Sequence, residues 1–226
     1  MKQGILNFKF KFKDKDFFIS KKNILAMDLI NQWPKWSNQI IFVYGPKKCG
    51  KTSIARIWQE RSRAIFLSRK RFDEIISSNF DVELITKNNW VIDDINSLFK
   101  KEMIDEKVLN LINILLSRKT SNLLITCDVP PRLVKTKIND LISRISSAFV
   151  VEVKEPDNNL LCKIIKKYLS DRNISISNHN LEYLSKRIER SYESAINVVT
   201  TTNRRTTGLA EFKSSSIVNI NPPSGA

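Results

Sequence analysis

The sequence predicts an α/β fold, in which a doubly wound parallel sheet of five strands is followed by a small, all-helical second domain. Three observations predict it. Up to about residue 155, short apolar runs alternate with helical stretches, which is typical of parallel strands joined by helices. The apolar runs are continuous rather than alternating, as expected for strands that are covered on both faces. Beyond Pro156 only helical periods remain.

The strands of the sheet are predicted from apolar runs that are bounded by turn residues. These runs occupy residues 39–45, 64–67, 89–95, 121–128 and 149–153. The first run ends at Gly45, and Pro130 and Pro131 stop the fourth because proline cannot donate to a sheet. Between the strands, helical spacing of apolar residues predicts helices at 51–62 and 106–119.

The second domain is predicted to begin with a helix that Asp157 or Asn158 caps. Its expected inner face is Leu160, Leu161, Ile164, Ile165 and Leu169. Two more helical stretches follow at 178–191 and 191–202. From about Asn203 the chain is rich in serine and threonine, which predicts a frayed tail.

Composition limits the function classes. The chain has 226 residues, of which 42% are hydrophobic, so it has the material for a real core. No run of about 18 uninterrupted apolar residues is present, which argues against a membrane span. The three cysteines have neither metal-site nor disulfide-framework spacing, which favours a reducing cytoplasm. The formal charge of +15 favours weak, non-specific attraction to nucleic acid, although the scattered lysines also fit a compositional bias.

The segment GPKKCGKT at 45–52 matches the phosphate-binding pattern G-x-x-x-x-G-K-[ST], between a buried strand and a helix. Gly45 and Gly50 let the backbone wrap so that its N–H groups point at phosphate oxygens, and the helix N-terminus adds partial positive charge. Lys51 is expected to reach the β- and γ-phosphates, and the Thr52 hydroxyl to ligate Mg²⁺. The full set of predicted nucleotide-binding residues is Gly45, Lys48, Cys49, Gly50, Lys51, Thr52 and Ser53.

Two acids end the third strand in the segment WVIDDI. A carboxylate at the carboxyl end of such a strand lies beside the metal, so Asp93 is predicted as the metal-side acid, together with Thr52. Asp94 is predicted to orient or deprotonate an attacking water. The alternative for Asp94 is a simple helix cap.

Polar residues after the fourth strand and before the fifth complete the predicted site. Thr126 or Asp128, in LLITCD, is expected to touch the γ-phosphate or the water, with a solvated strand end as the alternative. Arg144 stands just before the fifth strand. Its guanidinium is expected to stabilise charge on a transferring phosphate, in its own site or a neighbour's, with a surface salt bridge as the alternative.

Taken together, five blocks of the sequence resemble the AAA+ ATPases. The blocks are FVYGPKKCGKTS, VIDDI, LLITCDVPP, LISRISSAFVVEVKEPD and RIERSYESAIN. They are similar to the bacterial initiator DnaA and, more closely, to its shortened relatives of the Hda type, the regulatory inactivators of DnaA. The resemblance covers roughly residues 1–205 and implies a P-loop AAA+ domain at 14–155, a helical lid domain at 156–205 and a disordered tail at 206–226. That tail is too short for the helix-turn-helix domain of DnaA, which favours the shortened relatives.

The first residues add a feature that such relatives share, a short peptide that binds the sliding clamp. Residues 3–8, QGILNF, fit the bacterial clamp-binding pattern, with Gln3, Leu6 and Phe8 as anchors in a preformed pocket. The expected clamp-binding segment is 1–13. The alternative is an edge strand in which Ile5, Leu6 and Phe8 pack on the ATPase core.

The resemblance implies a cytoplasmic regulator of replication initiation, with two partners: the sliding clamp, which is the β subunit of DNA polymerase III, and ATP-bound DnaA, which Arg144 would activate in trans. Its own ADP or ATP, with Mg²⁺, would be chiefly structural, with weak or no intrinsic ATPase. Two alternatives stay open: an autonomous DnaA-like ATPase or helicase loader acting on DNA, and a non-catalytic clamp-binding adaptor. A homodimer and a non-specific contact with DNA are also left open, and no membrane partner is expected.

Overall fold

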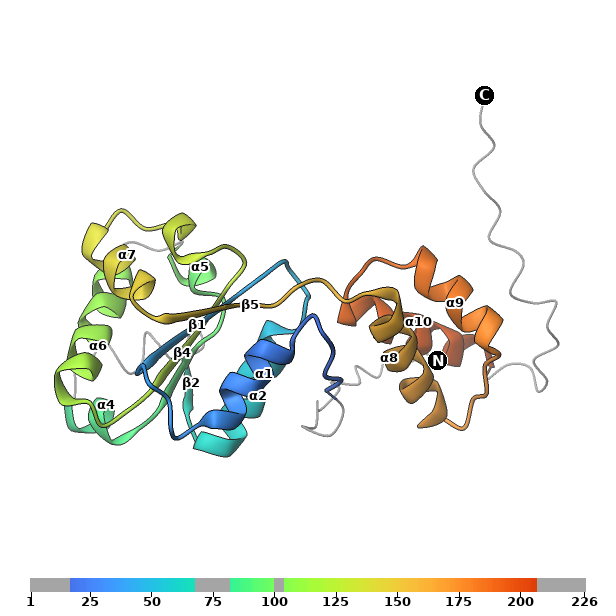
Figure 1. Cartoon of the computed structure of the whole chain (residues 1–226). Helices are drawn as coiled ribbons and strands as arrows, with labels where there is room; N and C mark the ends of the chain where they lie inside the picture. The colour runs from blue at the N-terminus through green and yellow to red at the C-terminus, as the bar shows by residue number, and fades with distance from the viewer. Residues whose placement is uncertain (1–16, 68–81, 100–103, 207–226) are drawn as a thin grey trace, which may run out of the picture. The chain divides into compact units, whose positions relative to one another are not determined.

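The computed structural model describes residues 17–67, 82–99 and 104–206, with the side chains of 200–206 left aside. The predicted clamp-binding anchors Gln3, Leu6 and Phe8 lie outside the described residues, as does the predicted tail beyond Thr206. The chain forms two compact units, one through Asp157 and one from Asn158 (Figure 1).

The first unit is built on a five-stranded sheet whose paired strands are all parallel, as predicted. The strands are β1 (Ile40–Tyr44), β2 (Ile65–Leu67), β3 (Trp90–Ile92), β4 (Leu123–Cys127) and β5 (Phe149–Glu152). Their order in the sheet is β2-β3-β4-β1-β5, so β1 lies between β4 and β5. At the carboxyl edge Tyr44 pairs with both Cys127 and Glu152, which aligns the ends of these three strands.

Helices cover both faces of the sheet, as the continuous apolar runs predict (Figure 1). Successive strand residues point to opposite faces, so Phe42 and Ile125 pack in a cluster with Val108 and Leu111 of α6, while Ile41 is buried on the other side. The helices of this unit are α1 (Ile24–Gln32), α2 (Lys51–Ser62), α4 (Val82–Lys87), α5 (Ile95–Leu98), α6 (Ile104–Arg118), the 3₁₀ turn η2 (Pro131–Leu133) and α7 (Asn139–Ser146). The predicted helix at 51–62 is confirmed to the residue, and the one at 106–119 begins two residues earlier and ends one residue earlier.

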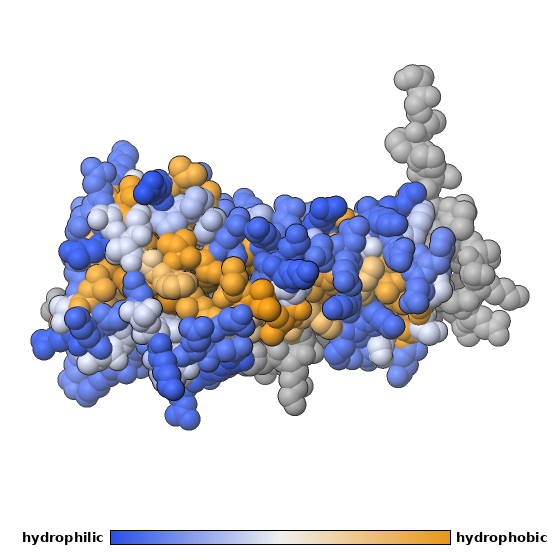
Figure 2. All heavy atoms as spheres, viewed as in Figure 1, coloured by the Kyte–Doolittle hydropathy of each residue, from blue (hydrophilic) through white to orange (hydrophobic). Residues whose placement is uncertain are grey.

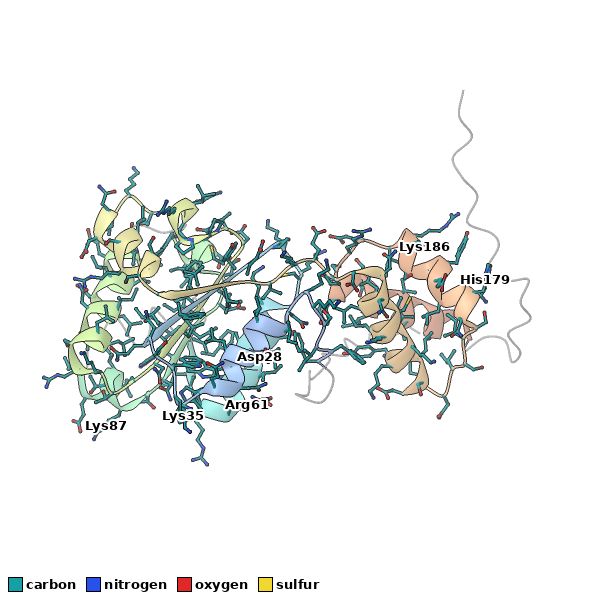
Figure 3. All side chains as sticks on the ribbon, viewed as in Figure 1. Asp28, Lys35, Arg61, Lys87, His179 and Lys186 are labelled. Atoms are coloured by element: carbon teal, nitrogen blue, oxygen red, sulfur yellow. The ribbon has the colours of Figure 1, made fainter. Side chains whose placement is uncertain are left out.

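The edge strand β5 is the least covered part of the sheet. Phe149 and Val150 are 46% and 38% exposed, whereas the strand β4 is buried along its whole length. Figure 2 shows apolar side chains at the surface in the region of β5. Polar and charged side chains elsewhere project outward, as Figure 3 shows for Lys35 and Lys87 in the first unit and for His179 and Lys186 in the second.

The second unit consists of α8 (Asn158–Ser170), α9 (Asn178–Arg187) and α10 (Tyr192–Thr206) in the part of the chain that is described. The predicted inner face of α8 is confirmed, because Leu160, Leu161, Ile164, Ile165 and Leu169 are all at most 4% exposed. Helix α10 continues to Thr206, about three residues beyond the predicted start of the tail at Asn203, and the rest of the predicted tail lies outside the described residues. No glycine or proline interrupts the chain between Tyr192 and Gly208, so nothing in the backbone breaks the helix earlier.

Within the described ranges, every helix is too short or too polar to cross a lipid bilayer.

Candidate nucleotide-binding site

The loop from Gly45 to Gly50 joins β1 to α2 and has the backbone conformation of a phosphate cradle. Gly50 is the N-cap of α2 with φ 107° and ψ 6°, a left-handed geometry that favours glycine. At Gly45 the reason for glycine is space, because a Cβ there would lie 1.9 Å from the carbonyl oxygen of Val153. The loop therefore leads directly to the first turn of α2, where free backbone N–H groups and the helix dipole favour an anion.

Lys51, at the start of α2, is turned into this loop. Its side chain is buried, at 9% exposure, and Nζ donates hydrogen bonds to the carbonyl oxygens of Gly45 (2.8 Å) and Pro46 (2.6 Å). An ammonium group at this place sets positive charge at the centre of the cradle, where the β- and γ-phosphates of a nucleotide would lie.

The loop residue Cys49 serves as a neutral, buried thiol. Burial raises its pKa, and the nearby Lys51 charge offsets only part of that effect. Its contribution to a phosphate site is therefore its backbone N–H rather than a thiolate. Lys48, by contrast, is exposed and takes a left-handed conformation with φ 62°.

Hydrogen bonds link Thr52, Thr126 and the two acids after β3 near the end of β4. Thr52 Oγ1 lies 3.0 Å from Asp93 Oδ2, and Thr126 Oγ1 donates to Asp93 Oδ1 at 2.6 Å. The backbone N–H of Asp94 in turn donates to Thr126 Oγ1 at 2.8 Å. The fold thus brings together residues from β3, β4 and α2, as their place at the carboxyl edge requires.

These oxygens suit a magnesium ion that is shared with a nucleotide. Among the described residues no group of three or more His, Cys, Asp or Glu side chains gathers, so an all-protein metal cage is not formed there. Magnesium commonly takes one or two protein oxygens, phosphate oxygens and water, and Thr52 and Asp93 fit that pattern. The Asp94 side chain is exposed, and its carboxylate makes no hydrogen bond or ion pair within the part of the chain described, which leaves it open to water.

Asp128, one residue beyond β4, is held by a residue that the sequence analysis did not single out. Asn96 Nδ2 donates to Asp128 Oδ1 at 2.8 Å, and Asn96 Oδ1 accepts from the backbone N–H of Lys135. Burial works to raise the pKa of Asp128, but the Asn96 hydrogen bond, hydrogen bonds from its own backbone and from Cys127, and the Lys47 charge together hold that pKa below its ordinary value. The carboxylate is therefore ionised near neutral pH. The neighbouring Cys127 thiol is instead protonated, because burial raises its pKa to about 11.

We expect Asn96→Ala to raise the pKa of Asp128 toward its ordinary value, because the largest stabilising hydrogen bond to the carboxylate is lost. A lowered acid pKa stabilises the folded state above the unfolded-state pKa, and this stabilisation is lost as the pH falls through the folded-state pKa. The variant should therefore lose stability relative to the wild type near neutral pH, and the difference should narrow in acid, where only the lost hydrogen bond from the Lys135 N–H remains. Titration of the Asp128 carboxyl carbon by NMR, with melting curves between pH 7 and 3, checks both results. A pKa of Asp128 that is equal in the two proteins would contradict the assignment.

Among the predicted catalytic residues that the structure describes, Arg144 is the one that it does not bring to the loop. It lies in the last turn of α7, before the amino end of β5, whereas the loop follows the carboxyl end of the neighbouring strand β1. The four residues of β5 separate these two edges by roughly 13 Å, at about 3.3 Å a residue. Its side chain is 45% exposed and lies 3.5 Å from Asp140, so the predicted alternative of a surface ion pair is present in this structure. Exposed pairs of this kind are worth little and break easily.

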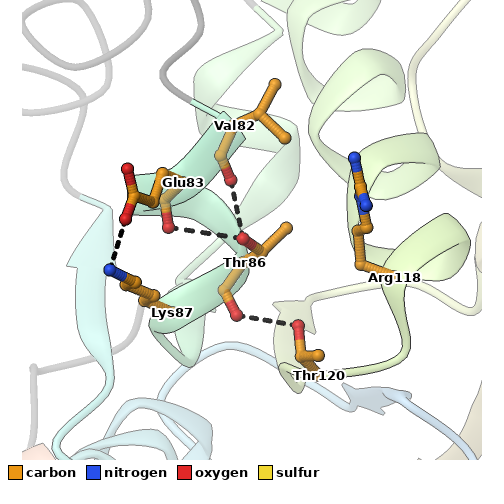
Figure 4. Close-up of a pocket in the computed structure, with 6 residues that line it drawn as sticks. All are labelled: Val82, Glu83, Thr86, Lys87, Arg118 and Thr120. Atoms are coloured by element: carbon orange, nitrogen blue, oxygen red, sulfur yellow. Dashed lines mark hydrogen bonds and ion pairs between the residues drawn. The ribbon is translucent and has the colours of Figure 1, made fainter.

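A surface pocket of the first unit lies away from the phosphate-binding loop (Figure 4). It opens between α4 and the end of α6, before β3 and β4 begin, and therefore at the amino edge of the sheet. The threonine hydroxyls of this pocket already donate hydrogen bonds to backbone carbonyl oxygens, as Thr120 Oγ1 does to Thr86 at 2.8 Å. The lining residues are Val82, Glu83, Thr86, Lys87, Arg118 and Thr120.

A model of a known protein family matches the part of the chain that carries this loop and these acids. Residues 6–152 match the model of the bacterial DnaA ATPase domain, which is most of the first unit and more than half of the chain. The chain belongs to the bacterial DnaA ATPase-domain family.

The fold of this DnaA-family chain is that of an AAA+ domain, as solved structures show. It superposes on domain III of the Thermotoga maritima replication initiation protein DnaA with a TM-score of 0.74 and 17% identity, covering 91% of this chain and 94% of that one. A DNA replication initiation factor gives a TM-score of 0.74 at 19% identity, with 84% and 64% of the two chains covered. A replication initiator DnaA bound to AMPPCP and single-stranded DNA gives 0.72 at 19% identity, with 84% and 63% covered. The chain thus spans somewhat less than two thirds of these two longer relatives.

Proposed function

We propose that this chain is a regulator of DNA replication initiation of the Hda type, which binds the sliding clamp and a nucleotide and stimulates ATP hydrolysis by DnaA in trans. The observation that carries the proposal is the position of Arg144. It is exposed in α7 at the edge of the sheet opposite to its own phosphate-binding loop, which supports a role toward a second molecule rather than toward its own nucleotide.

In this proposal the chain's own loop holds ADP or ATP. Loop amides and Lys51 contact the phosphates, and Thr52 and Asp93 hold Mg²⁺, which would neutralise charge on the β- and γ-phosphate oxygens. Structural neighbours in complex with AMPPCP support this choice of ligand. The nucleotide has a mainly structural part, with weak or no hydrolysis by the chain itself, although the open carboxylate of Asp94 can orient a water.

The DnaA partner is proposed to dock on the surface that carries α7. The Arg144 guanidinium would enter the nucleotide site of ATP-bound DnaA and stabilise the charge that builds on the transferred phosphoryl group. For this the side chain must leave Asp140, which costs little because the pair is exposed to solvent.

Tethering to the clamp is proposed for the first residues of the chain. The support is the pattern QGILNF at 3–8, in which Gln3 offers an amide and Leu6 and Phe8 offer apolar anchors for a preformed pocket. A clamp on DNA would raise the local concentration of this chain near DnaA, and the net charge of +15 would favour a weak contact with the same DNA.

The test is a reconstituted assay with ATP-bound DnaA and clamp loaded on DNA. We expect the wild-type chain to accelerate DnaA ATP hydrolysis only when clamp is present, and Gln3→Ala with Phe8→Ala to lose about 10²-fold or more of that effect, the gain that a tether typically gives. The double variant should also fail to be retained on immobilised clamp.

The outcomes separate the competing functions. Clamp retention without any acceleration of DnaA hydrolysis favours a non-catalytic adaptor. Steady ATP turnover by the isolated chain, abolished by Lys51→Ala or Asp94→Ala and raised by single-stranded DNA, favours an autonomous ATPase or helicase loader. Either result would overturn the proposal. The double variant itself should keep the wild-type melting temperature, which controls for misfolding.

A further inference from the structure

Thr126, the fourth of the five residues of β4, sits between the two acids of the site. It is 1% exposed, so its hydroxyl does not face solvent. Its Oγ1 lies 2.6 Å from Asp93 Oδ1 and 2.8 Å from the backbone nitrogen of Asp94. One hydroxyl therefore touches both residues of the acidic pair, the first through its side chain and the second through its backbone.

The number of hydrogen bonds that this hydroxyl can donate decides which partners it can serve. A threonine hydroxyl has a single proton to donate, and the bond to Asp93 Oδ1 uses that proton. The Asp94 N–H donates, so Thr126 Oγ1 is its acceptor. With its proton engaged, Thr126 has none to give to a γ-phosphate oxygen, which argues against the direct contact that the sequence suggests for it.

The two bonds fix different properties of the acids. Asp93 accepts from Thr52 on one side, at 3.0 Å, and from Thr126 on the other, which sets the orientation of its carboxylate. Asp94 has φ 52° and ψ 67°, a left-handed conformation that is unfavourable for a residue with a side chain. The bond from Asp94 N–H to Thr126, and the bond from the backbone N–H of Ser97 to the Asp94 carbonyl, hold that conformation.

We propose that Thr126 is a positioning residue, which orients the Asp93 carboxylate that would hold the magnesium ion and fixes the turn at Asp94 without contacting the nucleotide. The proposal rests on the nucleotide binding proposed above, but on neither the clamp nor DnaA. Partners that orient a metal ligand typically change metal affinity by about 10–100-fold when they are removed.

The experiment measures binding of a fluorescent ADP analogue to the purified full chain, with Mg²⁺ and with EDTA. We expect Mg²⁺ to tighten binding by the wild type. In Thr126→Val this Mg²⁺ effect should shrink by about tenfold or more, whereas affinity in EDTA stays within about threefold of wild type. Thr126→Ser, which keeps the hydroxyl, should restore the Mg²⁺ effect. Thr126→Ala tests the same loss without the second methyl group of valine against Asp93.

Thr136 offers a matched control, because its hydroxyl also donates to a carboxylate and accepts from a backbone N–H, at a place away from the site. Its Oγ1 donates to Asp105 Oδ2 at 3.0 Å and accepts from the backbone N–H of Ile138 at 3.1 Å. Thr136→Val should leave both affinities unchanged. An equal loss of affinity with and without Mg²⁺ in both Thr126→Val and Thr126→Ala would overturn the inference, as would a Mg²⁺ effect equal to wild type in either variant. Since the assay contains neither clamp nor DnaA, these outcomes leave the proposed regulatory function to its own test.

Discussion

Arg144→Ala is expected to lower the stimulation of DnaA ATP hydrolysis by this chain about 10³-fold or more, down to the rate of DnaA alone. An arginine supplied in trans to a phosphoryl-transfer site is worth about 10³–10⁵ in rate. Because Arg144 lies at the edge of the sheet opposite to its own loop, the variant should keep its affinity for ADP and its retention on clamp. Single-turnover hydrolysis by DnaA in the clamp-loaded assay measures the rate, and melting curves check the fold.

Arg118 supplies the matched control for this change. It is also an exposed arginine in the last turn of a helix, α6, that leads to the amino end of a strand, β4. Arg118→Ala should stimulate DnaA as the wild type does. Arg144→Lys should remain strongly impaired, because a lysine lacks the planar fork that contacts two oxygens at once. Full stimulation by Arg144→Ala would show that the proposed mechanism is wrong.

The sheet was predictable because its signal is local. Apart from Thr126 in β4 and Glu152 at the end of β5, the five strands consist of apolar residues, as expected for strands that helices cover on both faces. By contrast, α1 and α7 gave little local signal. Neither has a side-chain cap at its N-terminus, and the N-cap position of α7 is Ile138, which is a poor cap. Such helices form because they pack on the rest of the unit, through Ile30 in α1 and through Leu141 and Ile145 in α7, and packing partners are not adjacent in sequence.

The candidate site was likewise predictable only where its residues lie close together in the sequence. The spacing of Gly45, Gly50, Lys51 and Thr52 predicts the loop because all its parts lie within eight residues. The support of its acids does not follow from any motif. Asn96 meets Asp128, and Thr126 meets Asp93, across 32 and 33 residues of chain, and only the order of the strands brings these pairs together.

For Arg144, sequence spacing alone does not decide which nucleotide site the residue serves. The sequence places it before the fifth strand but leaves open whether it serves its own site or that of a neighbour. Parallel pairing of β5 with β1 places the start of β5 at the edge opposite to the loop, and this favours the neighbour.

Gly45→Ala is expected to have the largest effect on the chain itself. An alanine Cβ would lie 1.9 Å from the Val153 carbonyl oxygen, and backbone atoms cannot move aside as a flexible side chain can. Val153 is fully buried, and its N–H donates to the Tyr44 carbonyl oxygen at 2.7 Å, so relief of the overlap must part the ends of β1 and β5. Overpacking of this kind costs about 3 kcal/mol or more. For a chain of this size that lowers the melting temperature by about 6–12 °C.

The same change should remove the response to nucleotide, because the parted strands carry the first residue of the loop. ADP with Mg²⁺ at 100 times its Kd would stabilise the wild type by about 2.7 kcal/mol. Melting curves with and without ADP and Mg²⁺ therefore separate two effects in one experiment: a lower melting temperature without nucleotide, and no rise when nucleotide is added. Lys47→Ala, which changes an exposed side chain of the same loop, should leave the melting temperature without nucleotide within about 1 °C of wild type. If Gly45→Ala melted as the wild type does and still responded to ADP, the close approach of Val153 would not be what requires glycine at this position.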